Sequence, residues 1–580
     1  MLTKIRELML KEGIDTYIVT KMDPHQSEYS HEMYGEVAFV SGFTGSNGNI
    51  VITKDKAGLW TDPRYFLQAQ MQMAEDFELH KDILVGASNY INYALNITKE
   101  DGVIGFNGER LNTTLAKILL KKPNIKINSN IDFVSRIWKD RPKFSRNKIF
   151  AYGENYSGES FEQKLTKVKK EMLQAGASYY IISSLDDICW FLNIRSVSDT
   201  NPFNIFAYVV VTHFGTNLFI DTIPEDKEAI EYLEKNNINI FPYNDIFKYL
   251  ENMQKVMYCE PRTNFKVYNA FKDKKQILIK HDITTNLKMI KNSTEKNNIK
   301  TANEKDAIVF TKLIYWIKTN VNVSKISEID IVEKLEELRW KIPSYFCKSF
   351  ETICGYGKNG AIIHYKPEIE TSKILEPNGF VLVDSGSNFI EGTTDITRTI
   401  ALGELTFEMK RNYTAVLKGN IALSTSKFPY GTRGTHIDTI ARMPLWKLGL
   451  NYPHGTGHGI GHMLNVHEGP NSMSQNINSI VLEENMLLSN EPGIYINEQY
   501  GIRIENSVFI KKDDSTYFGN FLSFETVTFV PFEIDAILTE LLTDEEKQWI
   551  NKYHETVYNN LKDSLTTEEE NWLRQVTYPL

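Results

Sequence analysis

The sequence predicts a mixed α/β protein (α+β in its last part) that is built from several domains. Three observations lead to this prediction. The chain has 580 residues, which is more than a single hydrophobic core usually organises. Its first part alternates helical and strand patterns, as α/β units do. A glycine-rich, strand-like stretch then runs from residue 339 to about residue 530, and helical patterns return beyond Leu541.

The composition excludes several classes of protein. The net charge is −9, so the chain lacks the strongly basic character of nucleic-acid-binding proteins, and we expect no nucleic-acid partner. No apolar run reaches the length of a transmembrane helix, and we expect no membrane partner. The N-terminus lacks the apolar centre of a secretory signal, and the four cysteines suggest no disulfide framework. These features predict a cytoplasmic protein.

The first domain is predicted over residues 1–142. It opens with apolar residues at helical spacing, which are Leu2, Ile5, Leu8, Met9 and Ile14. A strand follows over residues 15–20, and a later strand ends near Trp60 before another helix. Asp62 and Arg64 stand at the end of that strand. We expect a structural ion pair there, with a groove-lining role as the alternative.

The second domain is predicted over residues 143–288, after a polar and basic linker at residues 141–147. Here the opening pattern recurs: a helix over residues 161–174, a stop near Gly176 and an apolar strand over residues 178–182. A duplication would explain this recurrence, and chance similarity of two α/β openings would explain it equally well.

The third domain is predicted over residues 289–580. A polar, Lys- and Asn-rich segment at residues 285–306 marks its start and precedes a long helix, and another helix is predicted over residues 327–338. Capping-box spacing predicts two helices near the C-terminus, at Thr543 with Glu546 and at Thr567 with Glu570. We expect four residues of the first of these helices to dock it on the body, namely Trp549, Ile550, Tyr553 and Val557.

Residues 452–467 form the most unusual stretch of this domain. They hold four of the twelve histidines of the chain, interleaved with glycines. A helix is disfavoured because each glycine costs about 1 kcal/mol there. We expect extended or looped backbone that something must approach closely. Clustered imidazoles indicate metal or proton chemistry, and a solvated polar loop is the alternative.

Four acidic residues near the ends of strand-like segments complement the histidines: Asp384, Asp395, Glu491 and Glu505. Singly, each could belong to a turn or a helix cap. Together they predict a metal site, because cations offset the repulsion between clustered carboxylates. So acidic a set suits two fairly hard divalent ions that share carboxylates, such as Mn²⁺, Co²⁺ or Fe²⁺, rather than structural zinc. Two such ions polarise a carbonyl and generate a hydroxide, so we expect amide or ester hydrolysis.

The sequence around these residues resembles the Xaa-Pro aminopeptidases (aminopeptidase P), in their long three-domain form. The matching motifs are DSG (384–386), GTTDITR (392–398), HGTGHGIG (454–461), NVHEGP (465–470), NEPG (490–493) and IRIEN (502–506), together with SGFTGS (41–46) near the start. The resemblance covers nearly the whole chain and favours the duplication. It implies two creatinase-like α/β N-terminal domains followed by a pita-bread metallopeptidase domain with a C-terminal helical extension.

The resemblance implies a set of five metal ligands. Asp384 binds one ion, His458 and Glu491 bind the other, and Asp395 and Glu505 bridge the two. The implied cofactor is a pair of divalent ions, with Mn²⁺ usual in the family and Co²⁺, Zn²⁺ or Fe²⁺ as alternatives.

The resemblance also implies catalytic and substrate-binding roles. His364 and His467 contact the substrate carbonyl and the proline side, and His454 orients groups or shuttles protons. Glu491 accepts the proton of the attacking water and passes it to the leaving nitrogen. The surrounding residues include Tyr495 and Arg503, which we expect to contribute to substrate binding.

His462, in contrast, matches no family role. We expect it to be a partly exposed polar side chain. Three departures from the family pattern remove no ligand: Glu391, Pro63 and residues 196–202.

We therefore expect an enzyme that removes the first residue from peptides whose second residue is proline, through a hydroxide held between two metal ions. The resemblance further suggests a homodimer. A prolidase, which cleaves only Xaa-Pro dipeptides on the same catalytic fold, is the nearest alternative. A catalytically silent pita-bread protein that only binds partners is a third hypothesis, and the presence of all five ligands disfavours it.

Overall fold

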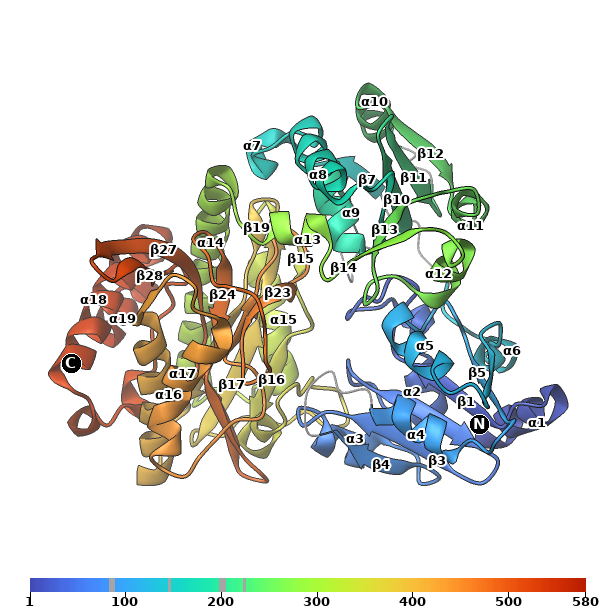
Figure 1. Cartoon of the computed structure of the whole chain (residues 1–580). Helices are drawn as coiled ribbons and strands as arrows, with labels where there is room; N and C mark the ends of the chain where they lie inside the picture. Colours follow the sequence, from blue (N-terminus) through green and yellow to red (C-terminus); the bar gives the residue numbers. More distant parts are fainter. Residues whose placement is uncertain (83–88, 144–147, 198–204, 223–225) are drawn as a thin grey trace. The chain divides into compact units, whose positions relative to one another are not determined.

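The computed structural model of the chain describes residues 1–82, 89–143, 148–197, 205–222 and 226–580. Within these ranges the chain divides into two compact units, one of residues 1–153 with 159–286 and one of residues 154–158 with 287–580. The predicted mixture of helices and strands is confirmed in both units (Figure 1). Residues 144–147 of the predicted linker and residues 198–202 of the third departure lie outside the described ranges.

The first unit contains two six-stranded sheets with the same topology. Their strand orders are β4-β3-β2-β1-β5-β6 and β12-β11-β10-β8-β13-β14. In each sheet the opening strand, β1 or β8, is antiparallel to one neighbour and parallel to the other. The remaining pairings also match in direction. Such a match of order and direction supports the duplication over chance similarity.

The strands of these sheets are short. The first sheet consists of β1 (Thr16–Thr20), β2 (Asn49–Thr53), β3 (Ala57–Thr61), β4 (Glu78–Lys81), β5 (Val103–Phe106) and β6 (Lys126–Asn128). The second consists of β8 (Tyr179–Ile182), β10 (Ala207–Thr212), β11 (Thr216–Ile220), β12 (Ile238–Pro242), β13 (Val256–Cys259) and β14 (Gln276–Ile279). A separate antiparallel pair joins β7 (Lys148–Ala151) to β9 (Ile194–Val197).

The two predicted opening helices are confirmed as α1 (Leu2–Glu12) and α8 (Phe161–Ala175). Each ends at a glycine in the left-handed region, Gly13 with φ 67° and Gly176 with φ 68°, a conformation that glycine adopts without strain. The first unit also contains α2 (Glu36–Ser41), α3 (Phe66–Gln72), α4 (Asn89–Ile97), α5 (Thr113–Leu120), α6 (Phe133–Ile137), α9 (Leu185–Leu192), α10 (Lys227–Lys235), α11 (Asp245–Leu250) and α12 (Phe265–Phe271). The helix α13 (Ile283–Lys288) spans the division between the units.

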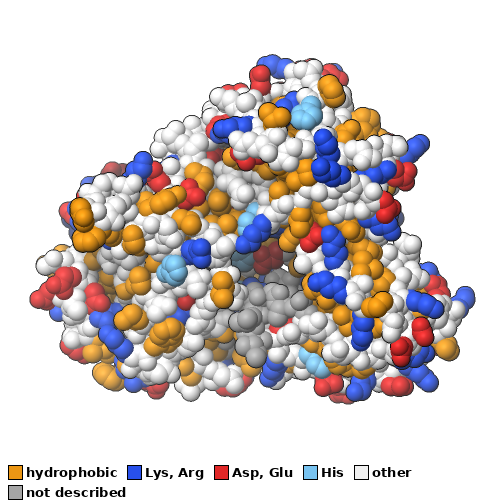
Figure 2. Space-filling view, in the orientation of Figure 1, with side chains coloured by type: hydrophobic (Ala, Val, Ile, Leu, Met, Phe, Trp, Pro, Cys, Tyr) orange, Lys and Arg blue, Asp and Glu red, His pale blue; other side chains and the backbone are white. Residues whose placement is uncertain are grey.

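Two smaller predictions are also confirmed. Arg64 Nη2 lies 2.8 Å from Asp62 Oδ2, and Arg64 Nε donates to Asp62 Oδ1 at 2.9 Å, so these residues form the expected ion pair. The four cysteines are free and buried. No helix within the described ranges is long and apolar enough to cross a membrane. On the face shown in Figure 2, acidic and basic side chains are interspersed.

The second unit is built from four sheets. Two are three-stranded, one of β16 (Ile353–Tyr356), β17 (Phe380–Ser385) and β20 (Ile396–Ala401), and one of β15 (Tyr345–Lys348), β18 (Ser387–Phe389) and β19 (Gly392–Thr393). The largest sheet has the order β21-β28-β27-β24-β22-β23, with β21 (Lys427–Pro429), β28 (Gly519–Thr526), β27 (Asn506–Thr516), β24 (Leu487–Asn490), β22 (Gly457–Gly459) and β23 (Glu468–Met473). A hairpin of β25 (Gly493–Ile496) and β26 (Tyr500–Arg503) completes the set.

Two pairs of long helices pack on these sheets. The helices α14 (Ser293–Asn320) and α15 (Glu328–Arg339) contact each other, and α15 contacts β16. The helices α16 (Phe407–Ser424) and α17 (Gly434–Trp446) contact each other, as Figure 1 shows, and α17 contacts β23. The short α7 (Glu154–Ser157) packs on α14. This arrangement matches the pita-bread domain that the resemblance implies.

The prediction that residues 339–530 are strand-rich overlooked α16 and α17. The reason lies in their surroundings. Residues of α16 are buried on most sides, including the run from Asn412 to Leu417, so the helix lacks the polar stripe that reveals an amphipathic period. The helix α17 starts at Gly434 and contains Pro444, and both residue types usually indicate interruption of a helix.

The polar segment at residues 285–306 is also more ordered than a connector. The helix α14 starts inside it, with Asn292 and Glu295 forming a capping box. Two of its polar residues, Asn303 and Asp306, are fully buried, and Asp306 Oδ1 pairs with Arg339 Nε at 3.2 Å. Part of the polar character of the segment therefore comes from buried hydrogen-bonding groups.

The C-terminal region consists of α18 (Asp544–Leu561) and α19 (Thr567–Val576). The capping box of Thr543 and Glu546 is confirmed. The second box is one residue earlier than predicted, at Thr566 and Glu569, so Thr567 is instead the first residue of the helix. Ile550, Tyr553 and Val557 are buried as expected, and Trp549 is partly buried against the same core.

Candidate metal centre

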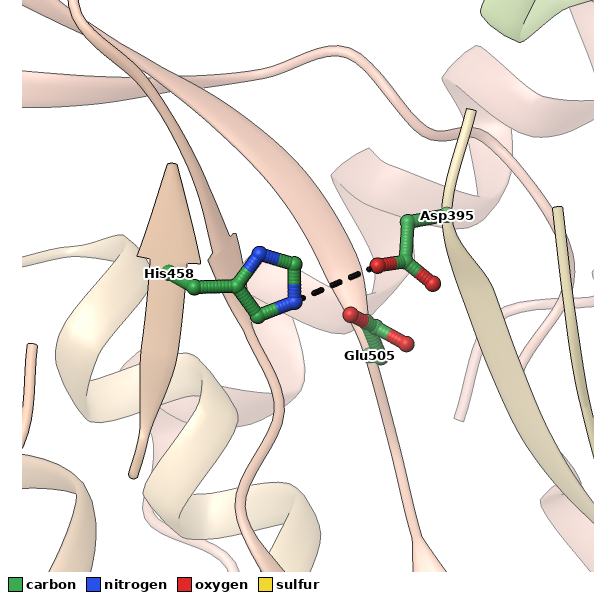
Figure 3. A group of neighbouring side chains, drawn as sticks. All are labelled: Asp395, His458 and Glu505. Atoms are coloured by element: carbon green, nitrogen blue, oxygen red, sulfur yellow. Dashed lines mark ion pairs between the residues drawn. The ribbon is translucent and has the colours of Figure 1, made fainter. Parts of the chain in front are cut away.

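Three of the five predicted metal ligands form a tight group within the second unit (Figure 3). One ligand atom from each of Asp395, His458 and Glu505 lies within 4.8 Å of the other two. The residues come from separate segments: Asp395 immediately precedes β20, His458 is the middle residue of β22, and Glu505 lies between β26 and β27. Sheet pairing therefore assembles a site from positions far apart in the chain.

The other two predicted ligands adjoin this group. Glu491 follows β24, and its Oε1 lies 3.5 Å from His458 Nε2, which is itself 3.3 Å from Asp395 Oδ2. Asp384 lies on β17, which pairs antiparallel with β20 so that Asp384 stands opposite Thr397. This register places Asp384 near Asp395, which immediately precedes β20.

Glycines on either side of His458 allow β22 to pack closely between β24 and β23. A Cβ atom at Gly457 would stand 1.9 Å from Ser489 O, and one at Gly459 would stand 2.1 Å from Glu468 O. The backbone of β22 is therefore extended, as predicted, and closely approached. At these two glycines the close approach is made by the backbone of the neighbouring segments of the same chain, at Ser489 and Glu468.

Ionising all the carboxylates of the cluster is unfavourable, because they are close together and largely removed from solvent. Burial, followed by the charges of Asp395, Glu491 and Asp384, raises the pKa of Glu505 well above its usual range. Burial is also the main cause of the raised pKa values of Asp384 and Glu491. Among the described residues, Asp384 Oδ1 and Glu505 Oε1 are buried oxygens without a hydrogen-bond partner. Unpartnered oxygens in an acidic cluster are the donors that hard divalent cations prefer.

The same carboxylates change the pKa of His458. Burial by itself would lower the pKa of the imidazole, but the Asp395 hydrogen bond and the Glu491 and Asp395 charges outweigh it and raise this pKa to about 9. The site thus stabilises a positive charge at the His458 ring. A divalent cation supplies such a charge and can replace the proton.

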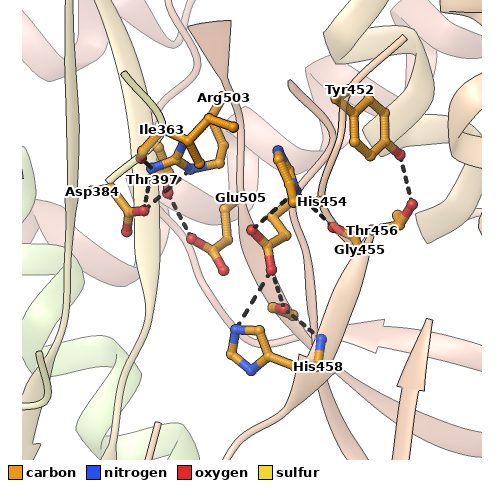
Figure 4. Close-up of polar contacts among 12 residues, drawn as sticks. Ile363, Asp384, Thr397, Tyr452, His454, Gly455, Thr456, His458, Arg503 and Glu505 are labelled. Carbon is orange, nitrogen blue, oxygen red and sulfur yellow. Dashed lines mark hydrogen bonds and ion pairs between the residues drawn. The ribbon is translucent and has the colours of Figure 1, made fainter. Parts of the chain in front are cut away.

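A chain of hydrogen bonds holds Asp384 and His454 in place, and Figure 4 shows its two ends, with Arg503 beside Asp384 and His454 beside Gly455. Arg503 Nε donates to Asp384 Oδ2 at 3.1 Å, and Arg503 Nη1 donates to Tyr495 OH at 2.6 Å. The Tyr495 hydroxyl lies 2.8 Å from His454 Nε2. Arg503 is nearly fully buried, so its charge balances Asp384 without screening by solvent.

Sequence reasoning missed two residues that orient candidate ligands. Thr397 Oγ1 donates to Glu505 Oε2 at 2.7 Å, and Ser489 Oγ donates to Glu491 Oε1 at 3.1 Å. Thr397 follows Asp395 by two positions, and Ser489 precedes Glu491 by two. Since strand residues two apart share a face, this spacing was the available signal.

The histidines with predicted catalytic roles lie at different distances from the group. The ring of His467 meets that of His458 edge to face, with centroids 4.2 Å apart. His454 Nδ1 lies 3.9 Å from Glu491 Oε2. His364 is half-buried in a turn, next to Ile363, whose carbonyl accepts a hydrogen bond from Arg503 Nη2 at 3.4 Å.

His462 contradicts its prediction, because its side chain is buried, with a relative exposure of 2%. Its Nε2 lies 3.0 Å from the carbonyl oxygen of Glu391, and its Nδ1 lies 3.8 Å from Glu295 Oε1. His462 therefore serves packing between α14 and the loop before β19. Of the departures from the family pattern, Glu391 pairs with Lys305 Nζ at 2.7 Å.

Family comparisons account for nearly the whole chain. Residues 297–512 match metallopeptidase family M24, and residues 520–580 match the C-terminal region of peptidase M24. Residues 1–132 and residues 140–295 each match a creatinase/prolidase N-terminal domain.

Individual relatives align over the full length. A probable Xaa-Pro aminopeptidase P of Neurospora crassa is 36% identical, over 100% of this chain and 88% of its own. Xaa-Pro aminopeptidase 1 of Dictyostelium discoideum is 35% identical, over 100% of this chain and 96% of its own. The crystal structure of X-prolyl aminopeptidase from Caenorhabditis elegans, described as a cytosolic enzyme with a di-nuclear active site, superposes with a TM-score of 0.95. It is 29% identical, over 100% of this chain and 99% of its own.

A dipeptidase structure shares the fold over a smaller part of this chain. The Xaa-Pro dipeptidase from Bacillus anthracis is 24% identical with a TM-score of 0.52, and the match covers 64% of this chain and 99% of that one.

Proposed function

Because the chain belongs to the Xaa-Pro aminopeptidases of metallopeptidase family M24, we propose that it removes the N-terminal residue from peptides with proline in second position. The observation that carries this proposal is the largely buried cluster of Asp384, Asp395, His458, Glu491 and Glu505, in a chain that aligns throughout with aminopeptidases. A prolidase activity has less support, since the dipeptidase match covers 64% of the chain.

We propose that these five residues hold two divalent ions, with Asp395 and Glu505 shared between them. The donor set fits, because it is acidic and largely buried, and because Asp384 and Glu505 each carry a buried oxygen without a hydrogen-bond partner. Mn²⁺ is our first choice, and Co²⁺, Zn²⁺ and Fe²⁺ are alternatives. When bound, such a pair polarises the scissile carbonyl and lowers the pKa of a coordinated water.

The protein residues then supply binding and proton transfer. We place the free α-amino group of the substrate beside these carboxylates and the ions they hold, so that the site would select a peptide by its N-terminal residue. The leaving nitrogen of an Xaa-Pro bond has no hydrogen and must gain one. Glu491, whose pKa burial raises, is suited to accept a proton from water and deliver it there.

The histidines complete this assignment. His364 and His467 donate hydrogen bonds to the carbonyl oxygen as its charge develops. His454 is fixed between Tyr495 OH at 2.8 Å and Gly455 O at 2.7 Å, so its ring is oriented before substrate binds. Tyr495 and Arg503 contribute by fixing the positions of this ring and of the Asp384 carboxylate.

A comparison of peptides tests the activity. With added Mn²⁺, we expect release of arginine from Arg-Pro-Pro at least about tenfold faster than hydrolysis of Ala-Pro, because the aminopeptidase accepts residues beyond proline. Arg-Ala-Pro is the matched control and should resist cleavage. Activity on Ala-Pro alone would identify a prolidase, and no hydrolysis of any peptide by protein containing metal would favour the binding-protein hypothesis. Elemental analysis of the same freshly purified protein identifies the metal.

We further propose that the protein is a cytoplasmic homodimer. Three apolar side chains at the end of α17 are 41–49% exposed, namely Met443, Trp446 and Leu448, and clustered apolar exposure is typical of an interface. Light scattering should give a mass twice that of the 66.9 kDa chain. A mass equal to one chain at micromolar concentration would refute the dimer. The location is supported by the relative described as cytosolic and is tested by fractionation of cells that express the protein.

A further inference from the structure

Arg398 lies on the strand that leads away from the candidate metal centre, three residues after Asp395. On one face of β20, Thr397 donates its hydrogen bond to Glu505 Oε2. Neighbouring strand residues point to opposite faces, and the Arg398 side chain extends toward the C-terminal region instead. It is 1% exposed.

The buried guanidinium is surrounded by neutral oxygen acceptors. They are Thr397 O (2.8 Å), Glu505 O (2.6 Å), Asn506 Oδ1 (2.8 Å), Val530 O (2.8 Å), Pro531 O (3.2 Å) and Tyr553 OH (2.9 Å). The five N–H groups of arginine thus all find acceptors. Two of these acceptors, Glu505 O and Asn506 Oδ1, belong to the segment of the candidate ligand Glu505. Arg398 itself lies on β20, which follows the candidate ligand Asp395. Arg398 therefore connects the segments that carry the two candidate bridging ligands.

Tyr553 of α18 connects this guanidinium to the C-terminal helices. Its hydroxyl accepts hydrogen bonds from Arg398 Nη2 at 2.9 Å and from Val530 N at 3.2 Å. It donates in turn to a carbonyl oxygen, with Val530 O at 2.8 Å. Its ring stacks on Phe532, with centroids 4.4 Å apart and planes at 25°, and Arg398 lies over the Phe532 ring, 4.9 Å from its centroid.

We propose that Tyr553 is a positioning residue for the candidate bridging carboxylates Asp395 and Glu505, so that the C-terminal helix α18 contributes to how tightly the centre holds metal. This inference rests on the proposed function. The path has two contacts, from the Tyr553 hydroxyl to Arg398 and from Arg398 to the Glu505 carbonyl. Metal affinity is sensitive to residues that do not touch the metal but hold its ligands in position. The helix thereby acquires a role beyond apolar packing.

The test uses the full chain, freed of metal with a chelator and titrated with MnCl₂ in a calorimeter. The Tyr553→Phe variant keeps the stacked ring and removes the hydroxyl. Of the two proposed Mn²⁺ ions, we expect the one that binds less tightly to lose about tenfold in affinity in this variant. This is the lower end of the effect reported for residues that orient metal ligands. At saturating Mn²⁺ its kcat should return to near the wild-type value, because Tyr553 touches no reacting group.

Two variants of the same helix serve as controls. Tyr558→Phe removes a hydroxyl that contacts Glu570 and Arg574, and its Mn²⁺ affinity should be unchanged. Val557→Ala removes apolar packing at a fully buried position, so it should lower the melting temperature and leave the affinity as in the wild type.

The outcomes are distinct. Wild-type affinity in Tyr553→Phe overturns the inference, and so does an equal loss of affinity in Val557→Ala, which would indicate helix docking alone. If the wild-type protein itself binds no Mn²⁺ or related ion, the proposed function fails instead.

Discussion

Replacing His458 with alanine is expected to abolish peptide hydrolysis and to leave the fold intact. His458 is the one imidazole in the proposed ligand set, and its ring lies between Asp395 and Glu491. Loss of a residue that hydrogen-bonds to a metal ligand lowers metal affinity or activity by up to about 100-fold. Loss of a ligand itself should therefore lower kcat/KM by more than about 100-fold. Peptide assays in excess Mn²⁺ measure the activity, and elemental analysis should find fewer than two ions bound.

The fold should survive because the His458 side chain is 21% exposed and is surrounded by the acidic cluster rather than by core residues. Circular dichroism and the melting temperature check this point. Glu491→Ala should behave similarly, since Glu491 is both a proposed ligand and the proposed proton carrier. The matched control is His213→Ala, at an exposed histidine of the first unit, with full activity expected. Wild-type turnover in either site variant would overturn the ligand assignment.

Replacing Arg503 with methionine is expected to lower the free energy of unfolding of the metal-free protein by about 3–5 kcal/mol, the range for breaking a buried ion pair. Arg503 is 2% exposed, and Asp384 beside it is 8% exposed. Without the guanidinium, Asp384 keeps its burial and its repulsion from Asp395, which raise its pKa. Tyr495 loses the donor that fixes it against His454. Urea unfolding of chelator-treated protein measures the effect.

Adding Mn²⁺ should recover part of this loss, because bound cations would supply positive charge beside Asp384, and binding to the folded state alone is stabilising. The control is Arg574→Met, which removes a surface ion pair with Glu570 and should leave the free energy of unfolding close to the wild-type value, because solvent screens such pairs. Equal destabilisation in the two variants would contradict the view that Arg503 balances a buried charge. A variant that Mn²⁺ does not stabilise at all would argue against metal next to Asp384.

Local signals in the sequence predicted the parts of the fold that depend on neighbouring residues. Apolar spacing predicts α1, the recurrence of the same opening pattern predicts α8, and both helices end at glycines that adopt a positive φ. The repeated opening of the first two domains was visible as a pattern, and two sheets of the same topology now support it. The failures were also local in origin. The helices α16 and α17 lack a polar stripe or contain proline, so the period that reveals a helix was absent.

The candidate ligands illustrate a second limit. Acids near strand-like segments and clustered histidines suggested a metal site, and the structure brings Asp395, His458 and Glu505 within 4.8 Å of one another. The orienting partners Thr397 and Ser489 were hidden, because a threonine or serine in a strand has many ordinary explanations. His462 was misjudged for the same reason. Its sequence neighbours are those of the other histidines, but it packs in a buried position against Glu391 and Glu295.

The sequence by itself determined the mixed α/β class, the recurrence of two N-terminal domains and the residue types of an acidic, imidazole-containing site, because residue chemistry and short-range periodicity are written locally. Tertiary structure alone decided which polar groups compensate one another. Arg503 reaches Asp384 across 119 positions of the chain, and Tyr553 reaches Arg398 across 155. Burial, hydrogen bonding and the pKa shifts of the cluster arise from such contacts, which form only when sheet pairing and helix packing bring distant segments together.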